Sequence, residues 1–181
     1  MVTIEPLDAR FEAAIQRLAS DPAIGATSNV PSPYPPDGAA RFVEETARRR
    51  EAGEEFVFAV LLDGEAVGTC GLIGVHRHAA ELGYWIGKPF WGRGAATVAA
   101  RLVVRFGFET LGLETIGAHC LSRNAASASV LVKAGFRRLG ESVLPRSKWP
   151  TEPVSIFELS REAWTAEIGP PATGGTSTGL D

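Results

Sequence analysis

A short glycine-containing turn holds the residues of this chain that are best suited to bind an anion. It reads Trp91-Gly92-Arg93-Gly94-Ala95-Ala96-Thr97 and stands directly before a helical stretch. Two glycines let the backbone turn sharply and approach a ligand, and the first N–H groups of a helix have no partner within it. Because the helix dipole is positive there, the turn predicts a phosphate pocket built from backbone amides, to which Arg93 could add a charge. A lone Gly-x-Gly is also compatible with an ordinary helix start.

Two further groups of reactive side chains give weaker signals. Cys70 and Cys120 each stand in an apolar stretch without CxxC spacing, so we expect small, buried hydrophobic side chains in a reducing compartment. His76, Arg77 and His78 form a polar cluster between two predicted strands. Adjacent loop residues with no carboxylate or Cys partner nearby do not favour a metal site, so we expect no metal.

The elements that must position the turn alternate between strand and helix patterns. We predict strands over residues 2–7, 56–62, 65–73, 81–87, 114–120, 136–143 and 154–159. Helices are predicted from Asp8 onward and over residues 37–50, 95–111 and 124–134. Asp63-Gly64 favours a hairpin turn, and Val98, Leu102 and Phe106 are expected to form one face of the helix over residues 95–111. Residues 22–38, which are rich in Pro, Ser and Gly, are predicted to be a loop.

This order of elements predicts one mixed α/β sheet with helices on both faces, in a single domain over residues 1–168. The tail over residues 169–181 has no apolar periodicity, and we expect it to be flexible. The net charge of -3 and the pI near 5.7 argue against nucleic-acid binding. The N-terminus lacks an apolar signal core, and no run of about 18 apolar residues is present, so we expect a cytoplasmic protein that does not bind membranes.

Residues 82–136 resemble the central motif of the GNAT (N-acetyltransferase) superfamily, whose turn reads Gln/Arg-x-x-Gly-x-Gly/Ala. Trp91 stands at the first position here, with Gly94 and Ala96 at the two small ones. Trp91 departs from the superfamily pattern, but aromatic-Trp-Gly-x-Gly is typical of the ribosomal-protein-alanine N-acetyltransferase (RimJ/RimL-like) branch. The run from Asn124 to Phe136 also resembles that branch's Asn-x-x-Ser-x-x-Val-Leu-x-Lys-x-Gly-Phe. With the surrounding elements, the resemblance covers nearly all of residues 2–164.

The resemblance implies the GNAT fold, with a mixed, mostly antiparallel sheet of about seven strands, and acetyl-CoA as co-substrate. The central strands splay apart in this family, and the pantetheine arm fits between them. The resemblance assigns the pyrophosphate to residues 91–97, backbone N–H groups near Trp85 and Ile86 to the cofactor, and Asn124 to the pantetheine arm. Asn124 also fits a helix N-cap, and both roles can hold together. Gly87 and Pro89 suit the splaying but equally fit an ordinary strand end.

Acetyl transfer needs a neutral amine, and therefore a base or a water chain leading to one. The resemblance offers Glu81, where some members carry a catalytic Glu, and His119, where others place a base. Free imidazole has a pKa of about 6.5, which suits deprotonation near neutrality. Two alternatives remain open: Glu81 could be a solvated charge, and His119 could be a structural residue held by hydrogen bonds. Ser127 matches the branch's Ser and is the expected proton donor, because the Tyr that many members place seven residues after the Asn is Leu131 here. Ser127 could equally be a helix cap.

The resemblance implies a primary amine as the acetyl acceptor. A protein N-terminal α-amine is the leading candidate, and small-molecule amines remain open as alternatives. The loop over residues 26–36 and the second helix would form the acceptor side, with Tyr34 and Pro35 lining it. Glu44 and Glu45 could attract a cationic amine or be solvated. Trp149 and Pro150 are expected at its border, and a homodimer is a reasonable expectation for this family.

Two other functions remain to be weighed. A dinucleotide-binding oxidoreductase would use Gly92 and Gly94, but residues 88–91 separate the strand from the glycines, and Glu114 begins its strand where the ribose-binding acid should end one. A GNAT-fold protein that binds acyl-CoA without transfer, as a sensor or scaffold, is the second alternative.

Overall fold

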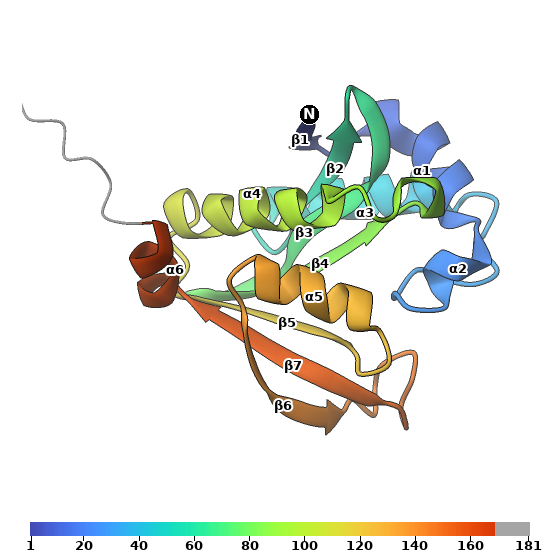
Figure 1. Ribbon diagram of the computed structural model, residues 1–181. Helices are drawn as coiled ribbons and strands as arrows, with labels where there is room; N and C mark the ends of the chain where they lie inside the picture. Colours follow the sequence, from blue (N-terminus) through green and yellow to red (C-terminus); the bar gives the residue numbers. More distant parts are fainter. Residues whose placement is uncertain (169–181) are drawn as a thin grey trace, which may run out of the picture.

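The computed structural model describes residues 1–168 and contains one seven-stranded sheet with the order β1-β2-β3-β4-β5-β7-β6 (Figure 1). Every neighbouring pair is antiparallel except β4 and β5. The mixed, mostly antiparallel sheet of about seven strands is confirmed. The strands are β1 Val2–Pro6, β2 Phe56–Leu62, β3 Glu65–His76, β4 Ala79–Ile86, β5 Thr115–Leu121, β6 Arg137–Val143 and β7 Pro153–Ser160.

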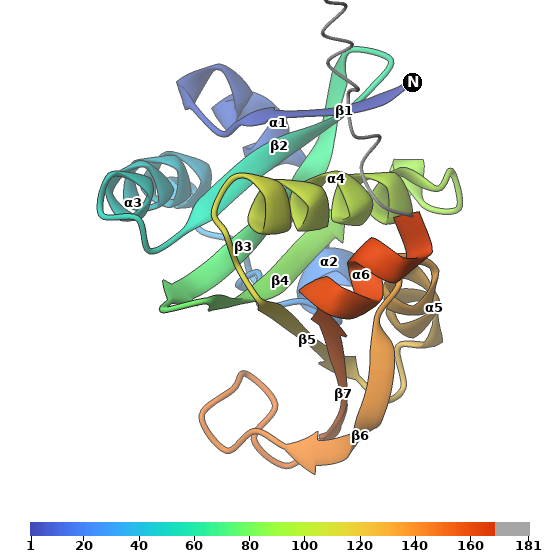
Figure 2. The same cartoon turned by 90° about the vertical axis from the view of Figure 1, so that its left-hand side faces the viewer.

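Helices cover both faces of the sheet, as predicted. The helices α4 and α5 pack on one face, and α1 and α3 pack on the other; Figure 2 shows α3 and α5 on opposite sides of the molecule. The helical segments are η1 Ala9–Phe11, α1 Glu12–Ala19, α2 Pro22–Gly25, α3 Gly38–Glu51, η2 Lys88–Phe90, α4 Ala95–Glu109, α5 Ala125–Lys133 and α6 Arg161–Ile168.

The parallel pair in the middle of the sheet is short. Only residues 79–81 of β4 pair with residues 115–117 of β5. Beyond that point β4 continues to Ile86 and β5 to Leu121, and the two strands diverge without pairing (Figure 1). The splayed central strands expected from the resemblance are therefore confirmed.

Local turn chemistry accounts for the hairpin between β2 and β3 and for the start of α5. Asp63 and Gly64 both have positive φ, of 51° and 85°, as a two-residue type I′ hairpin requires. Asn124 caps α5, since its side-chain oxygen accepts the Ser127 N–H at 3.1 Å. Asp37 stands at the predicted N-cap of α3, but its carboxylate pairs with Arg41 instead of the helix backbone.

The buried face of α4 is formed mostly by small residues. Val98 is exposed, and Leu102 and Phe106 are only partly buried. The core side of the helix is formed by Ala95, Ala99, Ala100, Val103, Val104, Gly107 and Phe108. Val98, Leu102 and Phe106 share one face of the helix, as predicted, but the most deeply buried face is the one rich in alanine and glycine, because small residues let the helix lie close to the sheet. Adding a Cβ to Gly107 would bring it within 2.8 Å of Leu72 Cδ1.

Three helical segments were not predicted. The helix α2 interrupts the loop over residues 22–38, η2 lies between β4 and the glycine turn, and α6 follows β7 directly. The helix α6 packs on the end of α4, where the rings of Trp164 and Phe108 lie 5.2 Å apart. The tail predicted to be flexible, residues 169–181, lies outside the described residues, so that prediction and the domain boundary at residue 168 stay predictions.

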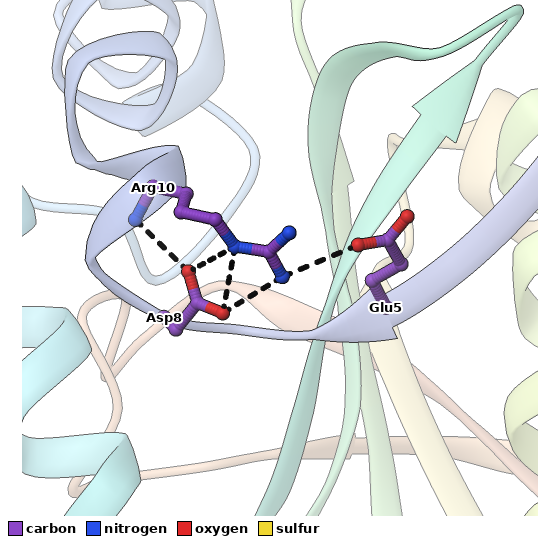
Figure 3. Close-up of polar contacts among 3 residues, drawn as sticks. All are labelled: Glu5, Asp8 and Arg10. Carbon is purple, nitrogen blue, oxygen red and sulfur yellow. Dashed lines mark hydrogen bonds and ion pairs between the residues drawn. The ribbon is translucent and has the colours of Figure 1, made fainter.

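The N-terminal junction is held by a small polar cluster far from the diverging strands. Asp8 caps η1 by accepting the Arg10 N–H at 2.9 Å, and the Arg10 guanidinium reaches both Asp8 and Glu5 (Figure 3). This exposed cluster links the end of β1 to the start of η1. Over residues 1–168, the helices are all too short or too polar to cross a bilayer.

Candidate active site

The glycine turn before α4 has the backbone that an anion pocket requires. Gly92 and Gly94 adopt φ of 75° and 77°, values that L side chains rarely adopt. Gly94 is the N-cap of α4, and no side chain caps the helix there. Within residues 1–168, the N–H groups of Ala95, Ala96 and Thr97 have no hydrogen-bond partner. Unpaired amides at the positive end of a 15-residue helix suit a phosphate group.

Trp91 and Arg93 flank this turn in different ways. The Trp91 indole N–H donates to the Ile86 carbonyl at 2.6 Å, which ties the turn to the end of β4. The Arg93 guanidinium lies over the Phe90 ring, 5.5 Å from its centroid. Arg93 is exposed, so its charge stands beside the helix N-terminus.

The edge of β4 that faces the gap carries free backbone donors. The Gly87 N–H donates to Val67 of β3 at 2.7 Å. Because donors alternate along a strand, the Trp85 N–H also faces β3, while those of Tyr84 and Ile86 face the gap toward β5. Of the two positions predicted to supply N–H groups, Ile86 therefore has the geometry for it, and Tyr84 joins it.

A cavity of about 650 Å³ passes through the gap between the diverging strands. Side chains alternate between the two faces of a strand, so Glu81 and Trp85 project toward α3, whereas Tyr84 projects toward α5. The cavity is lined from both sides. Its lining includes Glu81, Gly83, Tyr84, Trp85, His119, Cys120, Leu121, Ser127, Trp149 and Val154, together with residues of α3 and of the loop before it.

Glu81 and His119, the two candidate bases, touch one another. A Glu81 carboxylate oxygen contacts His119 Nδ1, at the place where β4 and β5 part. The hydrogen bond from Glu81 raises the pKa of His119 above its ordinary value, against a smaller opposing effect of burial. The contact involves Nδ1, so Nε2 is the ring nitrogen that does not contact Glu81.

Ser127 lies on the opposite side of the gap, with Tyr84. Its hydroxyl is 2.7 Å from the Tyr84 hydroxyl, and Tyr84 also donates to the Ser127 carbonyl at 3.1 Å. Leu131, at the family's Tyr position, is only 1% exposed and belongs to the core. Cys120 is close by and, like Cys70, is buried and free, in agreement with the prediction for both cysteines.

The side of the cavity expected to take the acceptor is formed by the loop before α3 and by the segment between β6 and β7. Tyr34 and Pro35 both line the cavity, and the Tyr34 ring packs so closely on Gly38 that a Cβ there would lie 2.8 Å away. Lys148 donates to the Val30 carbonyl at 2.7 Å and so joins the two segments. Of the pair predicted at the border, Trp149 lines the cavity.

The residues named from the sequence fall into two groups. The cavity brings together Glu81, His119, Ser127, Trp85, Tyr34 and Pro35. Ile86, Asn124 and residues 91–97 do not line it and lie at the end of β4 and the beginnings of α4 and α5. Glu45 lines the cavity while paired with Arg48 and Arg49, whereas Glu44 is exposed outside it.

Tyr84 and Lys148 were missed. Tyr84 had a readable signal, because the alternation in Leu82-Gly83-Tyr84-Trp85-Ile86 places it on the face of Leu82 and Ile86, toward α5. Lys148 had none, because its partners lie more than a hundred residues away in the chain. No group of three or more metal-binding side chains is present within residues 1–168.

Comparison with known proteins agrees with this architecture. The family model described as an acetyltransferase (GNAT) domain matches residues 2–137. A probable N-acetyltransferase of Bacillus subtilis, YjcK, is 36% identical over 112 residues, which cover 59% of this chain and 62% of that protein. A putative ribosomal N-acetyltransferase of the same organism, YdaF, is 34% identical over 88 residues, 46% of each chain. The match therefore spans between about half and two thirds of these relatives' own length.

Solved structures share the fold at lower sequence identity. RimJ of Mycobacterium smegmatis, in complex with CoA-disulfide, has a TM-score of 0.80 at 23% identity, with 89% of this chain and 82% of that chain covered. A spermidine N-acetyltransferase from Vibrio cholerae, in complex with CoA and spermine, has a TM-score of 0.77 at 18% identity, with 90% and 97% covered. The family match over residues 2–137 and the splayed seven-stranded sheet together establish that this chain belongs to the GNAT acetyltransferase family.

Proposed function

We propose that this chain is an acetyl-CoA-dependent N-acyltransferase that transfers acetyl to a primary amine by direct attack in a ternary complex. One observation carries the proposal: a single cavity passes through the gap between β4 and β5, with the Glu81–His119 pair at the point where the strands part. A thioester entering from one side and an amine entering from the other would meet beside a base.

His119 is the proposed base, and Glu81 is its partner. The carboxylate holds Nδ1 and favours the tautomer whose Nε2 lone pair is free to take a proton. The amine nitrogen attacks the thioester carbonyl carbon, the new C–N bond forms, and the C–S bond breaks with its electron pair on sulfur. The proton lost by nitrogen goes to Nε2. A raised pKa makes His119 a stronger base but keeps it protonated to higher pH.

Backbone amides supply the electrostatic part of the mechanism. The N–H groups of Tyr84 and Ile86 face the gap and suit the carbonyl oxygen on which negative charge develops. The unpaired amides of Ala95, Ala96 and Thr97 suit the cofactor pyrophosphate. Asn124, already the N-cap of α5, is proposed to contact the pantetheine arm at the same time.

The acceptor side of the cavity favours an amine with an apolar portion. Tyr34, Phe42, Trp85 and Trp149 provide aromatic surface, and the cavity volume of about 650 Å³ accommodates a small molecule or the first residues of a peptide. A protein N-terminal α-amine is the leading acceptor, because YdaF is named as a putative ribosomal N-acetyltransferase. The spermidine N-acetyltransferase among the structural neighbours keeps small amines as the second choice.

The test measures thiol release from acetyl-CoA with a panel of amines that includes alanine-terminated peptides and spermidine. Thermal unfolding with acetyl-CoA, CoA, NADH and ATP is measured alongside it. A ligand at about 100 times its Kd stabilises a protein by about 2.7 kcal/mol. A shift with acetyl-CoA and CoA together with turnover of any amine would support the proposal. A shift without turnover would favour an acyl-CoA sensor, and a shift with NADH alone would overturn the assignment of the turn.

We further propose that the protein acts in the cytoplasm, as a homodimer, without a metal. Light scattering of the purified protein gives its mass in solution. Activity that survives prolonged treatment with a strong chelator would agree with metal-free transfer.

A further inference from the structure

The hydroxyl groups of Tyr84 and Ser127 form a pair that joins β4 to α5. They lie 2.7 Å apart, and the Tyr84 hydroxyl also lies 3.1 Å from the Ser127 carbonyl oxygen. Both residues line the cavity, on the side of the gap opposite the Glu81–His119 pair. Tyr84 is half-buried, and its hydroxyl lies against the Ser127 hydroxyl inside the cavity, so it controls where the Ser127 hydrogen points.

We propose that Tyr84 is a positioning residue that turns the Ser127 hydroxyl toward the leaving sulfur of the thioester. This inference rests on the proposed function. The family pattern places a tyrosine on the helix, at the position where this chain has Leu131. In this chain the phenol is instead supplied by Tyr84, a residue of strand β4.

The hydrogen-bond inventory of the pair explains the role. A phenol and an alcohol each have one hydrogen. When Tyr84 donates to the Ser127 carbonyl, the Ser127 hydrogen is free to point back at the phenol oxygen. When Tyr84 donates to Ser127 Oγ, the Ser127 hydrogen must point elsewhere, and the cavity is the open direction. Negative charge developing on sulfur favours the second arrangement.

Tyr84 acts as a permanent donor and not as an acid. Burial raises its pKa, so the phenol keeps its proton throughout the working pH range. A hydroxyl that accepts one hydrogen bond donates the next more strongly. Sulfur leaves with the electron pair of the C–S bond and receives the Ser127 hydrogen bond, and the thiolate takes its proton from water on release. In this arrangement Ser127 is a hydrogen-bond donor and not the proton donor expected from the sequence, and both Ser127 and Tyr84 keep their protons.

A double-mutant cycle tests this assignment, with kcat measured for acetyl-CoA and the best amine. Tyr84→Phe should lower kcat on the order of tenfold, the loss expected for one hydrogen bond that matters in the transition state. In the Ser127→Ala background the same change should have almost no further effect, because Tyr84 acts only through Ser127. In the Ser127→Thr background, which keeps a hydroxyl, the tenfold loss should return.

Tyr34→Phe is the matched control, since Tyr34 is the other tyrosine of the chain and also lines the cavity. The fold-loss in kcat caused by Tyr34→Phe should multiply with the fold-loss caused by Ser127→Ala when the two changes are combined. The thermal shift given by CoA should be the same for Tyr84→Phe as for the unchanged protein, which shows that cofactor binding survives. Full kcat in Tyr84→Phe, or losses that multiply with Ser127→Ala, would overturn the role of Tyr84 alone. Absence of turnover by the unchanged protein would overturn the proposed function and this inference with it.

Discussion

Replacing Glu81 by Gln removes the charge beside His119 while nearly preserving the side-chain shape. The structure predicts a small effect on stability. The two side chains are 49% and 26% exposed, so the pair resembles a surface ion pair, with a contribution of about 0–1 kcal/mol. For a domain of this size, that is a fall in Tm of at most about 4 °C.

The sign of the pH dependence follows from the raised pKa of His119. The interaction stabilises the protonated imidazole, so it contributes fully at pH values below the unfolded-state pKa of His119. Its contribution disappears as pH rises through the folded-state pKa. The Glu81→Gln variant should therefore be destabilised most at acidic pH and match the unchanged protein at alkaline pH.

The effect on activity should be much larger than the effect on stability. A positioned general base contributes typically about 10²–10⁴-fold, so we expect kcat/KM to fall by roughly 10²-fold. The inflection on the acidic side of the kcat/KM profile should also move to lower pH, because His119 loses the group that raises its pKa. The ionisation of the amine substrate is the same for both enzymes, so a difference between the profiles belongs to the protein.

The assay is thiol release from pH 5.5 to 9, with Glu65→Gln as a matched control. Glu65 is 55% exposed, pairs with Arg17 at 3.5 Å, and lies outside the cavity lining. The control should leave the kcat/KM profile unchanged. If Glu81→Gln leaves both the rate and the inflection unchanged, His119 is not held as a base by Glu81, and the reasoning fails.

Three more changes test other parts of the structure. Gly94→Ala should cost about 1–2 kcal/mol through strain at positive φ and should diminish the thermal shift given by CoA. Gly107→Ala places a Cβ 2.8 Å from Leu72. The cost of overpacking, about 1–3 kcal/mol, should exceed the gain in helix propensity of about 1 kcal/mol, so Tm should fall. A higher Tm would contradict the close packing of α4. Lys148→Met removes the hydrogen bond to Val30 and should raise KM for the acceptor more than KM for acetyl-CoA in steady-state kinetics; equal effects would argue against an acceptor-side role.

Much of the fold could be predicted because its signals are local. Asp63-Gly64 specified the hairpin, and Gly92 and Gly94 marked the turn before α4 through the backbone angles that only glycine adopts readily. All seven strands lie within three residues of their predicted ends. The helix α6 was missed because Trp164 and its neighbours carry too short an apolar pattern to separate a helix from a tail.

The candidate site could be predicted as a set of residues but not as an arrangement. The sequence offered Glu81 and His119 as competing bases, whereas the structure brings them into contact, so that one holds the other. It offered Ser127 without the Tyr84 hydroxyl that faces it. These pairs join residues from different elements, and a contact of that kind depends on strand register and helix placement.

Sequence by itself determined most elements of this protein, the turn before α4 and the family, because propensity, turn chemistry and motif spacing are properties of a short stretch of chain. The tertiary structure alone decided which face of α4 is buried, that β4 and β5 part after Glu81, and that Lys148 joins the segment before β7 to the loop before α3. The physical reason is that these features depend on how surfaces distant in sequence fit together. A residue's type and its periodicity set the side toward which it points, but only packing sets what it meets there.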